Sequence, residues 1–596
     1  MTIINLSSKS SAHFFVQWLI VFFSFSACKK NDVPEKGEIL SFTIEAARNN
    51  EILTKDITGT IEGNKILLSV PRGVLLKNAY VTCKFKGEHL YVNYTLLDYT
   101  DRGLVIDSST VFTVINKKGN LFDYTIVLNE YEDPELVFNS FSIEKSKNPG
   151  LRGDILFEII GDTIYGSLDP DMHELIPALS TGAQDISVNA KTLQDIPEKI
   201  DFSREVTYTL TSSTGFRKAY FVKISWNKEV LTPHIYINTE GGVGINSKTN
   251  YVNAEITIDG RNVYNNYTGT TRIRGRGNST WGYPKKPYRL KLDKKEALFG
   301  LSSEKDWVLL ANYLDETHMM NAVAMKTGKL LEMPYTNNII PVELTLNGEY
   351  KGLYMFTEQV EAEKNRVNVG DGGVLIELDK NFDEPWQFKS ASYDLPVMLK
   401  YPDLTSDEEL IPIRLQFEQM ETLVAAPDFP NNNYLDYIDG SAVANYFVVY
   451  LLTDNKEINH PKSTFIYKTN TGKYTMGPIW DFDWAFGYDG ATRHFSSYDS
   501  SLFVSSSSPG TLFFTRLLSD PHIQEMVRQQ WADFNAHKLT DLLNFVDEYL
   551  ELIEGARYYD YQLWKVGEAD FASETTRLKT WLQNRASYLD KYIGSL

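Results

Sequence analysis

The chain has 596 residues, 42% of them hydrophobic, and a formal net charge of −19 at pH 7. This hydrophobic content excludes a largely disordered chain, and the length predicts several domains. The strongly acidic balance argues against nucleic acid as a partner for the chain as a whole.

The first 27 residues are predicted to be a signal peptide. Residues 14–27 are apolar or small, a stretch too short to span a bilayer comfortably but of the length found at the centre of signal peptides. The stretch runs into Ser26-Ala27-Cys28, which resembles a bacterial lipobox. The resemblance implies cleavage before Cys28 and acylation of that cysteine. The alternative is an ordinary signal peptide followed by a chance cysteine.

Lipidation would decide where the protein resides. Residues 28–38 are polar and contain Pro34, as suits a tether. We therefore expect a lipid-anchored protein of the bacterial cell envelope, periplasmic or at the cell surface, that meets the membrane only through Cys28. Cys83 is the other of two cysteines, so acylation of Cys28 leaves no intrachain disulfide and excludes zinc sites built on cysteines.

Two stretches of about equal length resemble each other. Residues 39–132 and 136–230 each begin with Ser-Phe-x-Ile-Glu and end in two alternating runs around a glycine-containing turn. The pattern predicts two tandem β-sandwich modules of immunoglobulin-like type. We interpret them as spacers between the anchor and a larger domain; a binding role is the alternative.

Residues 233–596 are predicted to form one α+β domain, with strands early and helices late. Apolar residues at helical spacing predict a helix over residues 317–332, between two groups of strands. From residue 406 the pattern is mostly helical, interrupted by a hairpin over residues 463–483.

Oxygen-bearing side chains gather around this hairpin. Asp454 follows an apolar helix, Asn459 comes five residues later, and Asp481 and Asp483 follow the hairpin. Carboxylates and amides at such positions suit a divalent cation. Protein kinases use the same order of Asp, Asn and Asp, although here no His-Arg precedes the first Asp and Asp-Phe-Asp replaces Asp-Phe-Gly.

A basic, glycine-rich turn lies upstream. Arg274, Gly275, Arg276 and Gly277 end a predicted strand, and the next strand, Lys-Lys-Pro-Tyr-Arg-Leu-Lys-Leu, is also basic. Glycines let backbone N–H groups approach an anion, and the cations attract it. The segment predicts a phosphate site; the alternative is a tight turn with a solvated basic face.

Taken together, four segments resemble the spore coat protein H (CotH) kinase family: RGRGNSTWGYPKKPYRLKL, DWVLLANYLDETHMMNAVA, VELTLNGEYKGLYMFTEQV and GPIWDFDWAFG. The resemblance covers about residues 233–500. It implies a divergent protein-kinase-like fold that uses ATP with Mg, or Mn, and phosphorylates Ser or Thr of a protein substrate.

The resemblance also implies roles at the metal end of the site. Asp454 would be the catalytic base, and Asp481 the principal metal ligand. Asn459 and Asp483 would assist Asp481.

At the nucleotide end, Arg274, Arg276 and Ser279 would face the phosphates, and Lys286 is the favoured lysine for nucleotide contact. Glu358 would pair with that lysine; its alternative role is an acid at a helix N-terminus.

Asn312 and Asp315 are expected to play a structural part as a cap leading into the helix predicted over residues 317–332.

Two functions remain open at this point. The first is a CotH-type protein kinase. The second is a non-catalytic surface binding or adhesion lipoprotein, with a glycan or host protein as ligand, on the same scaffold. The scarcity of ATP outside the cytoplasm favours the second, and the Asp454, Asn459 and Asp481 set favours the first.

Overall fold

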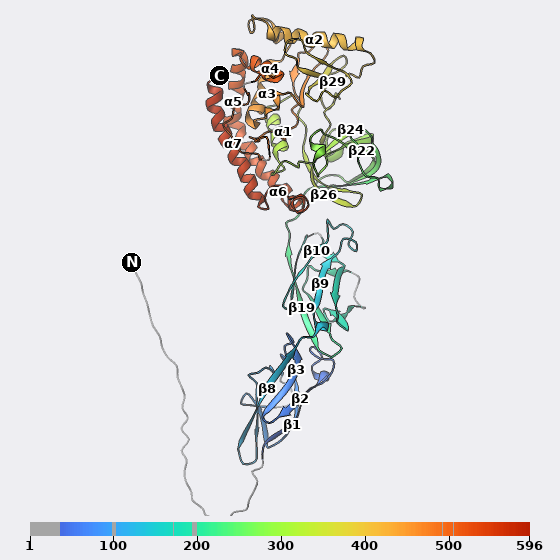
Figure 1. Ribbon diagram of the computed structural model, residues 1–596, viewed down its shortest axis with the longest axis vertical. Helices are drawn as coiled ribbons and strands as arrows, with labels where there is room; N and C mark the ends of the chain where they lie inside the picture. Colours follow the sequence, from blue (N-terminus) through green and yellow to red (C-terminus); the bar gives the residue numbers. More distant parts are fainter. Residues whose placement is uncertain (1–35, 98–102, 171, 194–198, 492, 505) are drawn as a thin grey trace, which may run out of the picture.

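The computed structural model describes residues 36–97, 103–170, 172–193, 199–491, 493–504 and 506–596 (Figure 1). The predicted signal peptide, Cys28 and most of the tether lie outside these ranges. None of the helices in the described part has the length and apolar character needed to cross a membrane.

The N-terminal part is made of sheets, as predicted. The first sheet has eight strands in the order β4-β1-β2-β3-β8-β7-β5-β6, with β3 parallel to β8. Its strands are β1 Glu38–Ile44, β2 Ile57–Glu62, β3 Lys65–Pro71, β4 Val81–Lys86, β5 His89–Val92, β6 Thr95–Leu96, β7 Val111–Ile115 and β8 Leu121–Tyr131. Cys83 is buried in β4, and burial raises the pKa of its thiol to about 12.

The second stretch forms a six-stranded sheet, β11-β12-β19-β18-β15-β16, beside smaller sheets β10-β9-β14 and β13-β17. Here β12 is parallel to β19, as β3 is to β8 in the first stretch. The strands are β9 Phe138–Ile143, β10 Ile155–Leu156, β11 Glu158–Ile160, β12 Thr163–Leu168, β13 Glu174–Leu175, β14 Pro177–Thr181, β15 Asp185–Val188, β16 Lys191–Thr192, β17 Ile200–Asp201, β18 Val206–Thr211 and β19 Arg217–Trp226.

A closed seven-stranded barrel follows, in the order β20-β21-β22-β23-β24-β26-β25. Its strands are β20 His234–Thr239, β21 Val252–Asp259, β22 Tyr267–Gly275, β23 Tyr288–Glu296, β24 Glu304–Leu310, β25 Ile340–Leu346 and β26 Glu349–Glu358. Alternate residues are buried, for example Ile235 and Ile237 in β20 and Ile256 and Ile258 in β21, because successive strand side chains point to opposite faces. The barrel core that results holds both ends of the glycine turn in place.

Beside the barrel, a five-stranded sheet, β28-β29-β27-β30-β31, packs against helices, one of which, α1, lies in the chain between β24 and β25 (Figure 1). The strands are β27 Val374–Leu378, β28 Gln387–Lys389, β29 Pro396–Tyr401, β30 Thr464–Lys468 and β31 Thr475–Met476. The helices are α1 Met320–Leu330, α2 Asp407–Ala425, α3 Gly440–Thr453, α4 Pro509–Leu518, α5 Pro521–Asp533, α6 Leu539–Trp564 and α7 Phe571–Gly594. The predicted hairpin is the β30–β31 pair, and the predicted helix before it is α3.

A buried ion pair joins the second module to the barrel. The Arg152 guanidinium lies 2.7 Å from Glu343 on β25 and 2.6 Å from Asp169 of its own module. It also lies over the ring of Tyr559 on α6, 4.5 Å from its centre. The three charged side chains are no more than 8% exposed, so the module is fixed to the C-terminal domain at this point.

Candidate active site

A pocket of about 640 Å³ opens between the barrel and the five-stranded sheet. This volume is typical of small-molecule sites. The loops that contribute to its lining include residues 276–280 between β22 and β23, residues 311–314 after β24, residues 379–384 after β27, residues 457–463 before β30, and residues 480–484 after β31.

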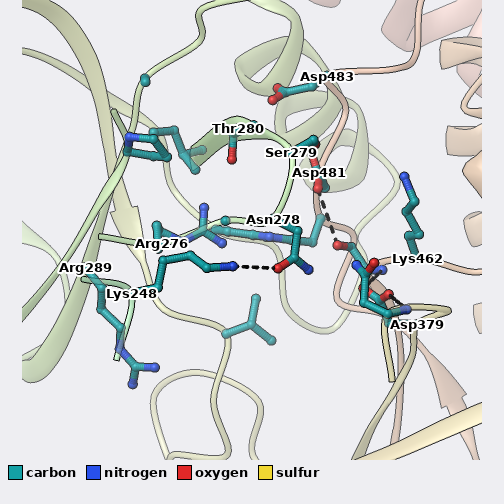
Figure 2. Close-up of a pocket in the computed structure, with 18 of the residues that line it drawn as sticks. Lys248, Arg276, Asn278, Ser279, Thr280, Arg289, Asp379, Lys462, Asp481 and Asp483 are labelled. Atoms are coloured by element: carbon teal, nitrogen blue, oxygen red, sulfur yellow. Dashed lines mark hydrogen bonds between the residues drawn. The ribbon is translucent and has the colours of Figure 1, made fainter. Parts of the chain in front are cut away.

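The glycine-rich turn, for which the sequence predicts a phosphate site, forms one wall of the pocket. β22 and β23 pair up to Gly275 opposite Tyr288, and residues 276–287 form the loop between them, with a 3-10 helix at Thr280–Gly282. Gly277 has φ +81°, and a Cβ there would lie 2.0 Å from Thr280 Oγ1, so only glycine fits. The Lys248 ammonium donates to Asn278 Oδ1 at 3.1 Å across the pocket wall (Figure 2).

Three guanidinium groups line this wall. Arg274 donates to the carbonyl oxygen of Lys248, and Arg289 binds Asp306 with two hydrogen bonds of 3.0 and 2.7 Å. Arg276 instead packs on the ring of Trp480, 5.5 Å from its centre. Burial lowers the pKa of Arg276, and attraction to Asp481 opposes that effect. The positively charged Arg276 side chain is therefore attracted to the acidic side of the pocket.

Asp481 and Asp483 line the opposite side (Figure 2). Asp481 has φ +64°, a conformation that is sparsely populated outside glycine and asparagine and often marks a functional position. Ser463 Oγ lies 3.4 Å from Asp481 Oδ2, and Asn321 on α1 donates to Asp483 at 3.0 Å. Burial, and then the charge of Asp481, raise the pKa of Asp483 to about 7.

Glu457 is the third acid at this end, and sequence reasoning missed it. It lies in a short 3-10 turn, Lys456–Asn459, and its carboxylate is 2.8 Å from the Lys462 ammonium. Burial and the charge of Asp481 raise the pKa of Glu457 to about 8. An acid with its pKa near neutrality, in a pocket, is a candidate for proton transfer.

The donor set fits Mg²⁺ bound together with a phosphate ligand. In the described ranges no group of three or more His, Cys, Asp or Glu side chains is arranged to hold a metal by itself. Mg²⁺, however, is usually bound by one or two carboxylates plus substrate phosphates. Burial, and then repulsion by Asp481, raise the pKa of Asp483, and a cation held by both carboxylates would relieve that repulsion.

Asp454 does not line this pocket. It ends α3 in a left-handed conformation with φ 51°, and its side chain is fully buried. Its carboxylate lies 3.2 Å from the guanidinium of Arg585 on α7 and accepts a hydrogen bond of 2.6 Å from Ser500. The structure therefore separates Asp454 from Asp481 and Asp483, with which the sequence pattern grouped it.

Asn459 also lies outside the pocket lining. Its amide donates to the carbonyl oxygens of Lys456 and Leu502, at 3.0 and 2.8 Å, and accepts from Val504 N and Thr511 Oγ1, at 3.2 and 2.8 Å. These four bonds use its donors and acceptors within the protein, so a structural role suits it better than metal binding.

Lys286 and Glu358 are not paired with each other. The Lys286 ammonium donates to the carbonyl oxygen of Trp281 at 2.7 Å, and Glu358 accepts two bonds from Asn338, at 2.8 and 2.6 Å. The neighbouring Lys285 does reach the pocket lining. It is buried against Asp560 on α6 at 2.5 Å, so it anchors the turn to the helices.

Ser279, which is predicted to face the phosphates, lines the pocket with the neighbouring residues of the turn. An acidic wall was not predicted: Glu377 and Asp379 lie at the end of β27, and Lys400 bridges Glu377 to Glu384. Burial raises the pKa of Glu377 to about 7. Two acidic residues at the end of an apolar strand are the sequence feature that could have predicted this wall.

Comparison with known proteins identifies the family. A candidate glycoside hydrolase from Bacteroides thetaiotaomicron aligns at 13% identity over 47% of this chain and 88% of its own, with a TM-score of 0.13 that supports no conclusion about fold or function. No curated protein matches the chain. Residues 273–589, over half of the chain, match the family model described as CotH kinase protein. They include the glycine turn, the Asp481 and Asp483 pair and the helices behind them, and the chain therefore belongs to the CotH kinase protein family.

Proposed function

We propose that the protein transfers the γ-phosphoryl group of Mg-ATP to Ser or Thr hydroxyls of a protein. The observation that carries this proposal is one pocket with Arg276 and the glycine turn on one side and Asp481 and Asp483 on the other. The domain would be a divergent kinase-like fold on two immunoglobulin-like modules, held at the cell envelope by lipid on Cys28.

Different residues would bind the metal and the phosphates. Asp481 and Asp483, with Ser463 beside them, would hold Mg²⁺, and Mn²⁺ suits the same oxygen donors. The metal would neutralise charge on the nucleotide phosphates. Arg276 and the backbone of the glycine turn would hold the phosphates in position, which is most of what phosphoryl transfer requires of a protein.

Glu457 is the best-placed base in the pocket. It would accept the proton of the acceptor hydroxyl as the hydroxyl oxygen bonds to the γ-phosphorus and the bond to the bridging oxygen of ADP breaks. The positive charge of Lys462, 2.8 Å from Glu457, would stabilise the negative charge of the transferred phosphoryl group. This assigns to Glu457 the role that the sequence pattern gave to Asp454.

Radiolabelled ATP tests the proposal. The purified full-length protein is incubated with ATP, Mg²⁺ or Mn²⁺ and a generic acidic protein acceptor, and compared with Asp481→Asn. We expect label transfer by the unaltered protein and a loss of at least about 100-fold in the variant, because charge stabilisation by the metal is lost. Asp403→Asn, an exposed acid away from the pocket, is the matched control. Absence of both transfer and a nucleotide-induced thermal shift would favour a binding protein.

Metal binding should depend on pH through Asp483. Its raised pKa, about 7, means that this carboxyl holds its proton in the metal-free protein at mildly acid pH. Metal must displace that proton, so we expect Mg²⁺ affinity to rise about tenfold between pH 6 and pH 8. Calorimetry at both pH values measures this, and Asp483→Asn should flatten the dependence. An affinity that stays constant with pH in the unaltered protein would contradict the assignment.

The raised pKa of Asp483 also makes the free energy of unfolding depend on pH. Since Asp483 binds its proton more tightly folded than unfolded, its contribution to the free energy of unfolding falls as pH rises from about 4 to about 7. Added Mg²⁺ should restore the lost stability at pH 8 more than at pH 5.

A further inference from the structure

The second module is bonded to α6 through one tyrosine side chain. Tyr559 Oη accepts a hydrogen bond of 3.0 Å from Asn227 Nδ2 and donates to the carboxylate of Asp169, and the Arg152 guanidinium lies over its ring. Arg152 and Asp169 belong to the second module, and Asn227 directly follows its last strand, β19. The module therefore holds α6, which lies at the side of the C-terminal domain that faces the module (Figure 1).

The segment that leaves the module also packs on α6. A Cβ at Gly555 would lie 2.5 Å from the carbonyl oxygen of Glu229, so the close approach of this segment to the helix requires glycine. Val230 is buried in the same hydrophobic core as the C-terminal helices. The module and its exit segment thus cover α6 over the turn that ends at Tyr559.

The next residue on α6, Asp560, holds the loop that contains the glycine turn. Its carboxylate is 1% exposed and lies 2.5 Å from the Lys285 ammonium and 3.2 Å from His318 Nε2. It also accepts from Leu353 N at 2.8 Å, and Lys285 donates in turn to the carbonyl oxygen of Leu353. Gly352, with φ +95°, makes this possible, because a Cβ there would lie 2.2 Å from Asp560 Oδ1.

Lys285 lies near the end of the loop of residues 276–287, which carries Arg276 at the pocket wall. A second bond holds the same end of the loop, since Tyr354 Oη donates to the carbonyl oxygen of Lys286 at 3.0 Å. A site made of backbone N–H groups and a guanidinium binds well only when those groups are held within about 0.5 Å of the productive geometry. The bonds at Lys285 and Lys286 supply that support.

We propose that the second module positions the glycine turn for phosphate binding: it holds α6 through Tyr559, and α6 holds the turn through Asp560. The inference rests on the proposed function, because it takes the glycine turn to bind phosphate. Tyr559 and Asp560 are positioning residues, since the pocket lining includes Lys285 but neither of them.

This role goes beyond that of a spacer. A spacer needs no buried charge in common with the domain that it carries, and a buried ion pair stabilises only when its geometry is well satisfied. Arg152 nevertheless pairs with Glu343 of the barrel, and the bonds of Tyr559 and Asp560 continue the contact to the pocket wall. Bonds among charged groups that are shielded from water are strong, so the arrangement leaves the turn little freedom.

The experiment removes one hydroxyl at the joint with the module and one charge at the loop. Calorimetry measures the binding of tripolyphosphate with Mg²⁺, and of Mg²⁺ alone, to the full-length protein, to Tyr559→Phe and to Asp560→Asn. Phenylalanine keeps the ring beneath Arg152, and asparagine keeps the size of the aspartate. Tyr558→Phe, at a neighbouring tyrosine that is 50% exposed, is the matched control. Urea unfolding gives the folded fraction of each protein.

We expect Asp560→Asn to weaken tripolyphosphate binding about tenfold, as when a residue that orients a binding group is removed. Tyr559→Phe should weaken it about threefold, because it loses a hydrogen bond to a charged carboxylate. Mg²⁺ alone should bind every variant within about twofold of the unaltered protein, since Asp481 and Asp483 lie on the opposite side of the pocket. A merely structural role would lower the folded fraction and leave the affinity of the folded molecules unchanged.

The contrary outcomes separate the failures. Unchanged tripolyphosphate affinity in both variants would overturn the positioning role and leave the phosphate site standing. Weakening in Asp560→Asn without weakening in Tyr559→Phe would overturn the part assigned to the module. Where Asp560→Asn does not fold, Tyr559→Phe decides the question, because it removes a single hydroxyl. Absence of tripolyphosphate binding in the unaltered protein would overturn the proposed function and this inference with it.

Discussion

Replacing Glu457 with glutamine is expected to lower the rate of phosphoryl transfer by roughly 10² to 10⁴-fold. Glutamine keeps the size and much of the hydrogen bonding of glutamate but cannot take up the proton of the acceptor hydroxyl. Because Asp481, Asp483 and Arg276 stay in place, the affinity for Mg-ATP should change little. Single-turnover rates with radiolabelled ATP, read beside calorimetric binding, separate the two effects.

The pH profile supplies a second readout of the same change. The free enzyme should gain kcat/KM as pH rises through the pKa of Glu457, about 8, and Glu457→Gln should remove that limb. Glu551→Gln, an exposed glutamate on α6, is the matched control. Full activity in Glu457→Gln, with activity lost in a folded Asp454 variant, would return the role of base to Asp454.

Local sequence features singled out two segments that the structure places in the pocket lining. Gly275, Arg276 and Gly277 are consecutive residues at the end of β22, and Asp481 and Asp483 follow a hairpin within a few residues. Such features depend on short-range geometry, so the residue types alone indicate where the side chains lie. The placing of both segments in one pocket followed only from the family resemblance.

The choice among Asp454, Glu457 and Asn459 could not be made locally. The left-handed end of α3 turns the Asp454 side chain away from the pocket, and Arg585, 131 residues further along the chain, takes it as a partner. Glu457 is turned toward Asp481 by the 3-10 turn that follows. A spacing pattern records neither the direction of a side chain nor a partner from a distant helix.

The features of the fold that the sequence did not predict depend on contacts between residues that are distant in the chain. The alternating runs predict strands, but closure of the barrel requires β20 to pair in parallel with β25, more than a hundred residues away. The ion pair between Arg152 and Glu343 joins residues 191 positions apart, and nothing in the sequence near either residue indicates the other as its partner.

The structure assigns Asp454 to stability, and the second large effect is expected there. Asp454→Asn should lower the free energy of unfolding by about 3 kcal/mol, because it leaves the Arg585 charge buried without its counter-ion. Burial raises the pKa of Asp454, and attraction to Arg585 opposes this. Asparagine is nearly the same shape and tolerates the left-handed conformation of φ 51°, so the loss reports on charge rather than on backbone strain.

A double-mutant cycle tests whether Asp454 acts by neutralising Arg585 or has a direct catalytic role. Arg585→Leu removes the stranded charge, so the pair Asp454→Asn and Arg585→Leu should be less destabilised than the sum of the single changes, as urea unfolding measures. Arg585 also donates to the carbonyl oxygens of Leu451, Tyr498 and Ser500 at 2.6 to 2.9 Å, so recovery should be partial. Activity per folded molecule should survive in Asp454→Asn. If instead stability holds and activity disappears, Asp454 acts on the substrate and the buried ion pair must open during the reaction.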